Sequence, residues 1–356
     1  MNLRVLVVDD TIMYRKVVGD ILAAIPGVDV VGTANNGKIA LSRMATLKPD
    51  LITLDVEMPI MNGLETLEAM QKEYPDIGVI MLSTLTKRGS DITMKALELG
   101  AFDFIAKPDA EAKQENVQYL RNALLPRIKA FEKRLELKTL LRQRSRVAAT
   151  APPVKPAPAI APSRRTGKSK AVAIGISTGG PNALATMLPK LPRLGVPIFV
   201  VQHMPPLFTK SLAESLNAKC QYEVREAEHN EAVLPDVIYI APGGKQMKVA
   251  SGVGGNKIIQ ITDDPPENNC KPAADYMFRS VAREYGALST GVIMTGMGGD
   301  GALGLRVLKS FGAVTIGQDE ESCVVYGMPK TAIEAGVVDV ISPLGMIASE
   351  IVRTVR

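Results

Sequence analysis

The chain has 356 residues, a length that predicts two or three domains. Hydrophobic residues make up 46% of it and charged residues 22%, which excludes a chain that is disordered throughout. The 42 Lys and Arg against 37 Asp and Glu give a net charge of +5, but Trp is absent and aromatic residues make up only 4%, which disfavours surfaces that stack nucleic-acid bases.

Two further classes of protein are disfavoured. No apolar run approaches the ~18 residues of a membrane span, and the first apolar run stops at Asp9 and Asp10, unlike a signal peptide. The three cysteines, Cys220, Cys270 and Cys323, are an odd number without C-x-x-C spacing. We therefore expect a reduced, cytoplasmic protein without a zinc site.

Five short apolar runs alternate with helical patterns along the first 140 residues. Apolar residues at helical spacing lie between the runs, for example over residues 12–22 and 38–47. The alternation predicts an α/β domain with a doubly wound parallel sheet. The runs resemble buried parallel strands and cover residues 3–8, 29–33, 51–54, 79–82 and 102–106.

Polar residues stand at the carboxyl ends of these predicted strands, where sheets of this kind bind ligands. The set is Asp9, Asp10, Asp55, Ser83 and Lys107. Three converging carboxylates repel one another unless a hard cation such as Mg²⁺ lies among them. A hydroxyl and an ammonium suit phosphoryl oxygens, so the set can accept a phosphoryl group on a carboxylate. Helix capping would explain one such aspartate, but not five polar groups at four strand ends.

About the first 125 residues resemble the response-regulator receiver domain, which has a flavodoxin-like fold. The resemblance is carried by the acidic pair, by residues 55–63 (DVEMPIMNG) and by the Lys-Pro pair at 107–108. It implies that Asp55 accepts the phosphoryl group. It implies a set of Mg²⁺ ligands: Asp10, Asp55, the backbone carbonyl of Glu57 and, through water, Asp9. It also implies a set of switch residues: Ser83, Phe104 and Lys107.

The positive charge is concentrated between the two halves of the chain. Residues 141–170 hold eight basic residues, five prolines and no acidic residue, whereas the flanking segments have net charges of −1 and −2. Such a composition cannot bury a core and is typical of an extended linker. We predict a first domain over residues 1–140 with an extended last helix, a flexible linker over 141–170, and a second domain over 171–356.

The second half begins with an apolar run over residues 171–176 that leads into a Gly-rich turn. Residues 175–179 spell G-x-S-x-G, which places Ser177 between a strand and a helix. Backbone N–H groups and the helix N-terminus lie near its hydroxyl in such a turn. On its own the pattern is weak, because Gly-rich turns before helices more often bind phosphate or bind nothing.

Two other predicted strand ends complete a possible acyl-transfer set. Residues 197–203 end at His203, and residues 291–295 precede a Gly-rich loop that contains Asp300. The alternatives are a structural histidine and a helix N-cap. Together, Ser177, His203 and Asp300 supply a nucleophile, a base and an orienting carboxylate. Their order along the chain is not that of the α/β-hydrolases. His229 is a poorer candidate because acidic residues flank it in a predicted exposed loop.

The order of receiver, linker and second domain resembles the CheB family of chemotaxis protein-glutamate methylesterases. The matching motifs are IGISTGG (174–180), QHMP (202–205), YIAPG (239–243), DYMFRS (275–280), MTGMGGDG (294–301) and YGMP (326–329). The resemblance implies an α/β methylesterase domain with Ser177 as nucleophile, His203 as base and Asp300 as its orienting partner. It implies that backbone N–H groups stabilise the oxyanion, those of Met297 and Thr178. Residues 268–271 (NNCK) depart from the His and Arg that are common in this family.

The resemblance also implies an activity and its partners. Phosphorylation would activate hydrolysis of glutamyl γ-methyl esters on the cytoplasmic helices of chemoreceptors, with release of methanol, and the enzyme would also deamidate receptor glutamines. A chemotaxis histidine kinase would donate the phosphoryl group, with Mg²⁺ in the receiver and no cofactor in the catalytic domain. No nucleic acid or membrane insertion is expected.

An alternative is a response regulator whose output domain binds DNA or a nucleotide. The output segment is disfavoured for DNA because its net charge is −2 and it lacks a basic recognition helix. It also lacks the G-x-x-x-x-G-K-[ST] sequence that cradles nucleotide phosphates.

Overall fold

The computed structural model describes residues 2–108, 113–147 and 167–356. It divides the chain into two compact units, Met1–Pro152 and Pro153–Arg356. Of the predicted linker, residues 148–166 lie outside the described ranges, and residues 141–147 belong to a long helix. Within the described ranges, no helix is both long and apolar enough to cross a membrane.

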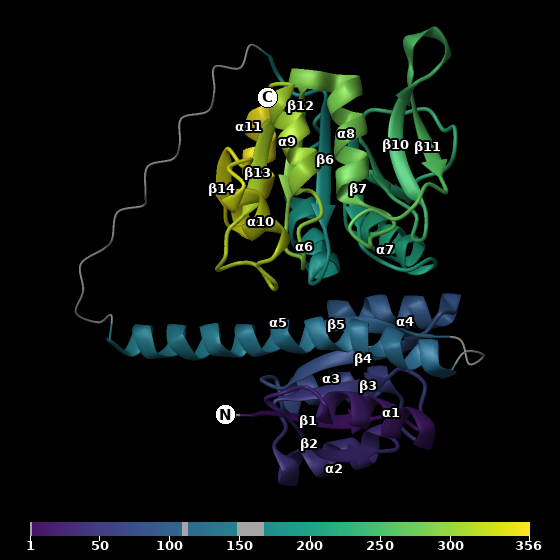
Figure 1. The fold of residues 1–356 in the computed structure, drawn as a ribbon, viewed down its shortest axis with the longest axis vertical. Helices are drawn as coiled ribbons and strands as arrows, with labels where there is room; N and C mark the ends of the chain where they lie inside the picture. The colour runs from purple at the N-terminus through teal and green to yellow at the C-terminus, as the bar shows by residue number, and fades with distance from the viewer. Residues whose placement is uncertain (1, 109–112, 148–166) are drawn as a thin grey trace. The chain divides into compact units, whose positions relative to one another are not determined.

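The first unit is built on a five-stranded parallel sheet with the order β2-β1-β3-β4-β5 (Figure 1). Its strands are β1 Leu3–Val8, β2 Val28–Ala34, β3 Leu51–Asp55, β4 Gly78–Thr84 and β5 Asp103–Lys107. Its helices are α1 Ile12–Ala23, α2 Gly37–Leu47, α3 Gly63–Glu73, α4 Lys87–Glu98 and α5 Lys113–Val147. The predicted doubly wound α/β fold is confirmed.

Local sequence explains where the elements near the strand ends begin. β3 is buried along its whole length, which accounts for its mostly apolar sequence, LITL, before Asp55. α3 begins at a capping box: the Asn62 side chain accepts from the Glu65 N–H at 3.0 Å, and the Glu65 carboxylate accepts from the Asn62 N–H at 2.9 Å. This cap ends the loop that follows Asp55.

The second unit is built on a seven-stranded parallel sheet with the order β14-β13-β12-β6-β7-β9-β8. Its strands are β6 Ala171–Ile176, β7 Ile198–Gln202, β8 Glu223–Glu226, β9 Val237–Ile240, β12 Ser289–Ile293, β13 Val314–Gln318 and β14 Val340–Ser342. Its α-helices are α6 Gly180–Met187, α7 Phe208–Asn217, α8 Ala274–Tyr285, α9 Ala302–Ser310, α10 Met328–Glu334 and α11 Leu344–Val355. Short 3₁₀ turns cover Leu188–Lys190, Val253–Gly255 and Gly286–Leu288.

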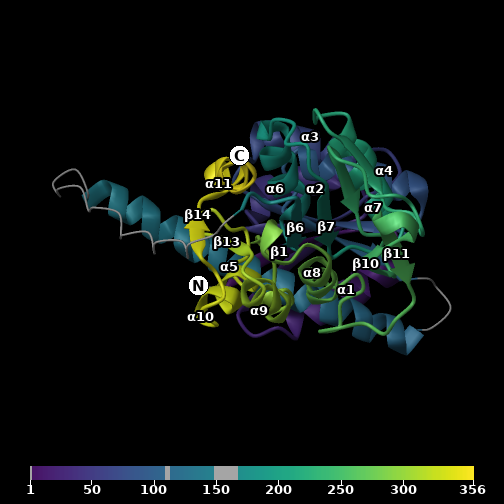
Figure 2. The ribbon, with the colours of Figure 1, turned by 90° about the horizontal axis from the view of Figure 1, so that it is seen from above.

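Helices cover both faces of this second sheet. Figure 2 shows α6, α7 and α11 on one face and α8, α9 and α10 on the other. An antiparallel pair, β10 Gln246–Ser251 and β11 Lys257–Thr262, packs beside α8 and was not predicted from the sequence. The doubly wound arrangement predicted for the second domain is therefore confirmed, with this hairpin added to it.

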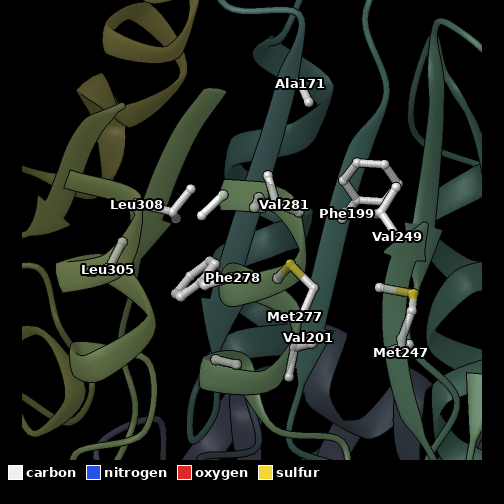
Figure 3. Packing of buried hydrophobic residues seen from close by; sticks show 14 of the residues in the cluster. Ala171, Phe199, Val201, Met247, Val249, Met277, Phe278, Val281, Leu305 and Leu308 are labelled. Atoms are coloured by element: carbon white, nitrogen blue, oxygen red, sulfur yellow. The ribbon is translucent and has the colours of Figure 1, made fainter. Parts of the chain in front are cut away.

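The core of the second unit is arranged around α8. Figure 3 shows Met277, Phe278 and Val281 of α8 between Leu305 and Leu308 of α9 and the side chains of β7 and β10. These apolar side chains are buried, and burying side chains of this size stabilises the fold by about 1.5–3 kcal/mol each. The packing fixes the start of α8 beside the loop that follows β12.

Candidate functional site

In the first unit, an acidic cluster lies at the carboxyl end of the sheet. Lys107 Nζ contacts Asp9 Oδ2 and Asp55 Oδ2, each at 2.7 Å. All three side chains are at least nine-tenths buried. The Lys107 ammonium also lies 4.6 Å from the centre of the Tyr14 ring, which fixes it from another side. The sequence placed these residues at three strand ends, and the structure brings them together.

Burial and the neighbouring charges both shift the pKa values of this cluster. Burial raises the pKa of Asp55 to about 6, although the positive charge of Lys107 acts in the opposite direction. Burial lowers the pKa of Lys107, but Asp55 and Asp9 outweigh it, so the pKa is raised overall. Carboxylate oxygens of Asp9, Asp10 and Asp55 lie within 4.8 Å of one another. Such a set of hard oxygen donors fits a cation of the Mg²⁺ type.

Of the predicted switch residues, Lys107 belongs to the acidic cluster itself, whereas Ser83 has another partner. The buried Ser83 hydroxyl donates to the backbone carbonyl of Gly89 at 3.1 Å, at the start of α4. The Phe104 side chain is only 4% exposed. Ser83 and Phe104 are therefore both buried in this structure.

In the second unit, Ser177 lies on the turn between β6 and α6. Its N–H donates to the Thr295 carbonyl at 2.9 Å, and its own carbonyl accepts from Gly180 at 2.7 Å. Gly179 has a φ of +76°, a conformation that glycine adopts without strain. The buried Gln202 side chain donates to the Ser177 carbonyl at 2.9 Å. These contacts fix the turn at the carboxyl ends of β6, β7 and β12.

His203 follows β7 and is paired with Asp300. Its Nε2 lies 2.8 Å from Asp300 Oδ2. The same carboxylate accepts backbone N–H groups from the start of α8, Ala274 at 2.6 Å and Asp275 at 3.1 Å, and the Asn268 amide at 3.1 Å. Asp300 therefore has four donors, and it does not serve as an N-cap of α9, whose N-cap is Gly301.

The pKa values of this pair move in opposite directions. Burial alone raises the pKa of Asp300, but the hydrogen bonds from His203 and the two α8 N–H groups outweigh it, and the pKa is lowered. Burial alone lowers the pKa of His203, but its contacts with Asp300 and Cys270 raise the pKa to about 9. The pair therefore favours an imidazolium beside a carboxylate.

The other ring nitrogen of His203 faces a cysteine. Cys270 Sγ lies 3.6 Å from Nδ1 of His203 and 3.4 Å from the Asn268 carbonyl oxygen. Within the described residues, no hydrogen bond joins the Ser177 hydroxyl to His203. The two residues are nevertheless neighbours, because the His203 N–H donates to the carbonyl of Ile176 at 3.1 Å.

Backbone N–H groups beside Ser177 are available for a ligand. In the described part of the second unit, those of Thr178 and Met297 donate to no protein acceptor. The loop carrying Met297 approaches Ser177 very closely, since a Cβ at Gly296 would lie 2.7 Å from the Ser177 Cβ. Thr295 holds the two segments together by donating its hydroxyl to the Thr178 carbonyl at 3.0 Å.

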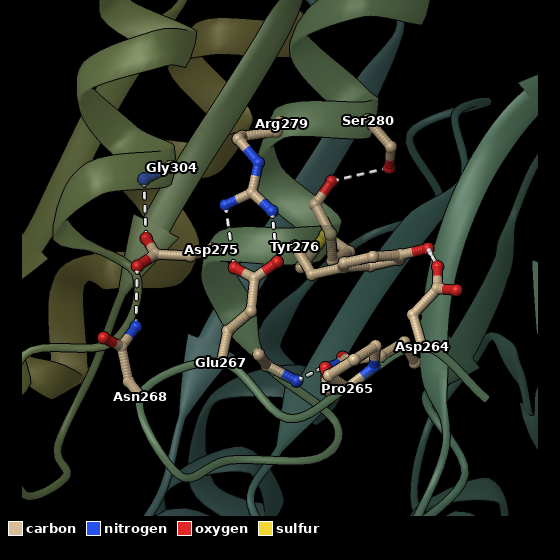
Figure 4. Close-up of polar contacts among 12 residues, drawn as sticks. Asp264, Pro265, Glu267, Asn268, Asp275, Tyr276, Arg279, Ser280 and Gly304 are labelled. Carbon is tan, nitrogen blue, oxygen red and sulfur yellow. Dashed lines mark hydrogen bonds and ion pairs between the residues drawn. The ribbon is translucent and has the colours of Figure 1, made fainter. Parts of the chain in front are cut away.

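A loop between β11 and α8 supplies residues that the sequence analysis did not assign to the site. Figure 4 shows this loop tied to α8: Glu267 binds Arg279, and the Asn268 amide donates to Asp275 at 2.9 Å. Because the same amide also reaches Asp300, it bridges the two carboxylates. The departure at residues 268–271 was the sequence signal for this loop. His229 is exposed, as predicted, and accepts the Ile261 N–H at 3.1 Å.

Known proteins match both units. The CheB methylesterase family model matches residues 172–351, and the response regulator receiver domain model matches residues 5–118. A protein-glutamate methylesterase/protein-glutamine glutaminase from Desulfotalea psychrophila is 55% identical over all of this chain and 99% of its own length. One of the same name from Bacillus subtilis is 43% identical over 99% of both chains.

A solved structure supports the likeness of the second unit. The CheB methylesterase catalytic domain of Thermotoga maritima is 40% identical and has a TM-score of 0.51. The match covers 52% of this chain and 99% of that one.

Proposed function

Because the chain belongs to the CheB methylesterase family and carries a receiver domain, we propose that it hydrolyses glutamyl γ-methyl esters of chemoreceptors through Ser177, His203 and Asp300. The observation that carries the proposal is the 2.8 Å contact between His203 Nε2 and Asp300 at the strand ends where Ser177 lies. The same site deamidates glutamine, as the relatives' name says of them.

In the proposed reaction, the protons pass through His203. The Ser177 hydroxyl attacks the ester carbonyl carbon, and the neutral form of His203 accepts its proton. Because the pKa of His203 is raised to about 9, this neutral form becomes more populated as the pH rises towards that value. Since Nε2 is hydrogen-bonded to Asp300, the proton goes to Nδ1. The contact between Nδ1 and Cys270 must break before Nδ1 can accept it. Asp300 stabilises the imidazolium. Methanol leaves with that proton, and water then hydrolyses the acyl-enzyme by the same path in reverse to release the glutamate carboxylate.

Two backbone donors stabilise the oxyanion. The N–H groups of Met297 and Thr178 have no protein acceptor in the described part of the second unit and flank the Ser177 turn. One such donor is typically worth ~10²–10³ in rate. The close approach of Gly296 to Ser177 supports this assignment, because it brings the Met297 backbone to the nucleophile.

Phosphorylation of Asp55 regulates this activity. When bound, Mg²⁺ neutralises charge on the incoming phosphoryl group. Asp10, Asp55 and the Glu57 carbonyl would hold the cation, with Asp9 through water, and Lys107 would bind a phosphoryl oxygen. The donor is a histidine kinase of the chemotaxis system, and the substrate segments are the cytoplasmic helices of methyl-accepting chemoreceptors.

The proposal is tested by methanol release from methylated receptor. Ser177→Ala should lower the rate at least ~10³-fold while the fold is retained. A phosphodonor should raise the rate of the unsubstituted chain. Unchanged methanol release by Ser177→Ala would refute the nucleophile assignment. DNA or nucleotide binding is not favoured as an alternative, given the family to which the chain belongs.

A further inference from the structure

The thiol of Cys270 has a position that the proposed hydrolysis does not use. It lies 3.6 Å from Nδ1 of His203, the nitrogen on the side away from Asp300. The Asn268 carbonyl lies 3.4 Å from the same sulfur and can accept the thiol proton. The His203 side chain is mostly buried, and Cys270 is half-buried. A thiol, an imidazole and a carboxylate are thus aligned in one row.

We propose that Cys270 Sγ and His203 Nδ1 together bind Zn²⁺, with Asp300 holding the imidazole from its other side, and that the bound ion inhibits the enzyme. The ligand atoms of Cys270, His203 and Asp300 lie within 4.8 Å of one another. Thiolate and imidazole are the ligand types that Zn²⁺ prefers in proteins.

The distances fit a tetrahedral ion. Zn–S and Zn–N bonds of about 2.3 and 2.05 Å, at a tetrahedral angle, separate the two ligand atoms by about 3.6 Å. The sulfur and the nitrogen already lie 3.6 Å apart, so neither side chain needs to move far. Water completes the coordination, because these side chains supply two ligands.

Asp300 has the role of an outer partner. A zinc-bound histidine usually donates its other ring N–H to a carboxylate, which orients the ring and makes it a better ligand. Asp300 Oδ2 lies 2.8 Å from Nε2. Its remaining contacts come from Asn268 and the start of α8, so the carboxylate itself is held in place.

Binding has a defined chemical consequence. The ion replaces the thiol proton and any proton on Nδ1, and both protons pass to solvent. A metal on Nδ1 removes the lone pair that would accept the Ser177 proton. The inhibition therefore rests on the proposed function, whereas the binding does not. No C-x-x-C spacing marks this site in the sequence, because its two ligands are separated by 67 residues.

Binding is measured first, on full-length Ser177→Ala protein with excess Mg²⁺ present to fill the acidic cluster of the first unit. Zn²⁺ is titrated in competition with a chromogenic chelator. We expect one zinc per chain at this site, and Cys270→Ser in the same background should weaken it at least about tenfold. Cys220→Ser, another half-buried cysteine, is the matched control and should bind normally. Equal binding by Cys270→Ser overturns the proposal.

Two further measurements test the Cys270 ligand directly and separate zinc binding from the proposed activity. Co²⁺ in place of Zn²⁺ should give a thiolate-to-metal absorption band in the Ser177→Ala protein, and absence of this band refutes a Cys270 ligand. Zn²⁺ should inhibit methanol release by the unsubstituted chain reversibly on adding chelator, and Cys270→Ser should resist it. Equal inhibition of both would overturn the inhibitory role, while a failure to release methanol at all would count against the proposed function alone.

Discussion

Asp55 and Asp300 are both buried carboxylates at the carboxyl edge of a parallel sheet, yet their pKa values are shifted in opposite directions. The pKa of Asp55 is raised to about 6, whereas that of Asp300 is lowered. Burial acts in the same direction on both. The difference therefore lies in what each carboxylate touches.

Asp300 has a full set of donors, and Asp55 does not. Asp300 accepts from an imidazole, an amide and two backbone N–H groups. Asp55 contacts Lys107, but Asp9 shares that lysine and Asp10 adds negative charge nearby. Asp300 is suited to stay ionised and orient a base. Asp55 is suited to be completed by a cation and to react with a phosphoryl group.

The largest expected effect comes from removing the charge of Asp300, the carboxylate with a full set of donors. Asp300→Asn should lower kcat for methanol release by about 10³–10⁴-fold, because the imidazolium of His203 loses its counter-charge and its ring orientation. Asp339→Asn is a matched control. The Asp339 carboxylate accepts a hydrogen bond from the Thr315 N–H at 2.9 Å, at the amino end of β13. A loss of less than tenfold for Asp300→Asn would contradict its assigned role.

The next largest effect is expected in the pH dependence of Mg²⁺ binding at Asp55, the carboxylate with few donors. Because the pKa of Asp55 is raised to about 6, the group is ionised above that pH and takes up a proton as the pH falls through it. Mg²⁺ binding should therefore weaken about tenfold per pH unit below 6. Calorimetric titration of the full chain measures this, with Asp55→Asn as the comparison. An affinity that is constant between pH 7 and pH 5 would be inconsistent with the raised pKa.

A smaller effect is expected from one of the four donors to Asp300. Asn268→Ala should lower kcat about tenfold, since Asp300 and Asp275 lose the amide that bridges them. KM should not change, because Asn268 is a positioning residue. Steady-state kinetics separate the two, and Asn256→Ala on the exposed turn between β10 and β11 is the control. An effect confined to KM would instead indicate contact with substrate.

The smallest change in basal rate is expected at Asp55 itself. Asp55→Asn should leave unstimulated methanol release unchanged and abolish its increase by a phosphodonor, since the substitution removes the acceptor oxygen. Asp50→Asn, at the opposite end of the same strand, should keep the increase. If a phosphodonor still activated Asp55→Asn, the phosphorylation site would have to lie elsewhere.

The sequence was most informative about where strands end. The runs before Asp9, Asp55 and Ser177 are mostly apolar, with interruptions at Arg4 and Thr53, because both faces of a parallel strand are largely buried. Each run ends at a polar residue. In a parallel sheet those ends share one edge. The pairing of His203 with Asp300 could therefore be expected, as could the cluster around Lys107.

The sequence could not show the contacts made by loops. Asn268 and Cys270 reach the site because α8 is packed into the core and its first N–H groups bind Asp300. No periodicity marks such a placement, since the partners are distant along the chain. Nor could the sequence show that Nε2, and not Nδ1, faces Asp300.

The close approach of Gly296 to Ser177 has a consequence for mutational tolerance. A Cβ at Gly296 would lie 2.4 Å from the Met328 sulfur and 2.7 Å from the Ser177 Cβ. In a library of all single substitutions, we expect no replacement at this position to retain activity. The adjacent Met297 is 39% exposed and is proposed to act through its backbone N–H, so it should accept many replacements. Two neighbouring positions of one loop would thus tolerate substitution very differently. We expect this pattern where backbone atoms, and not side chains, form the site.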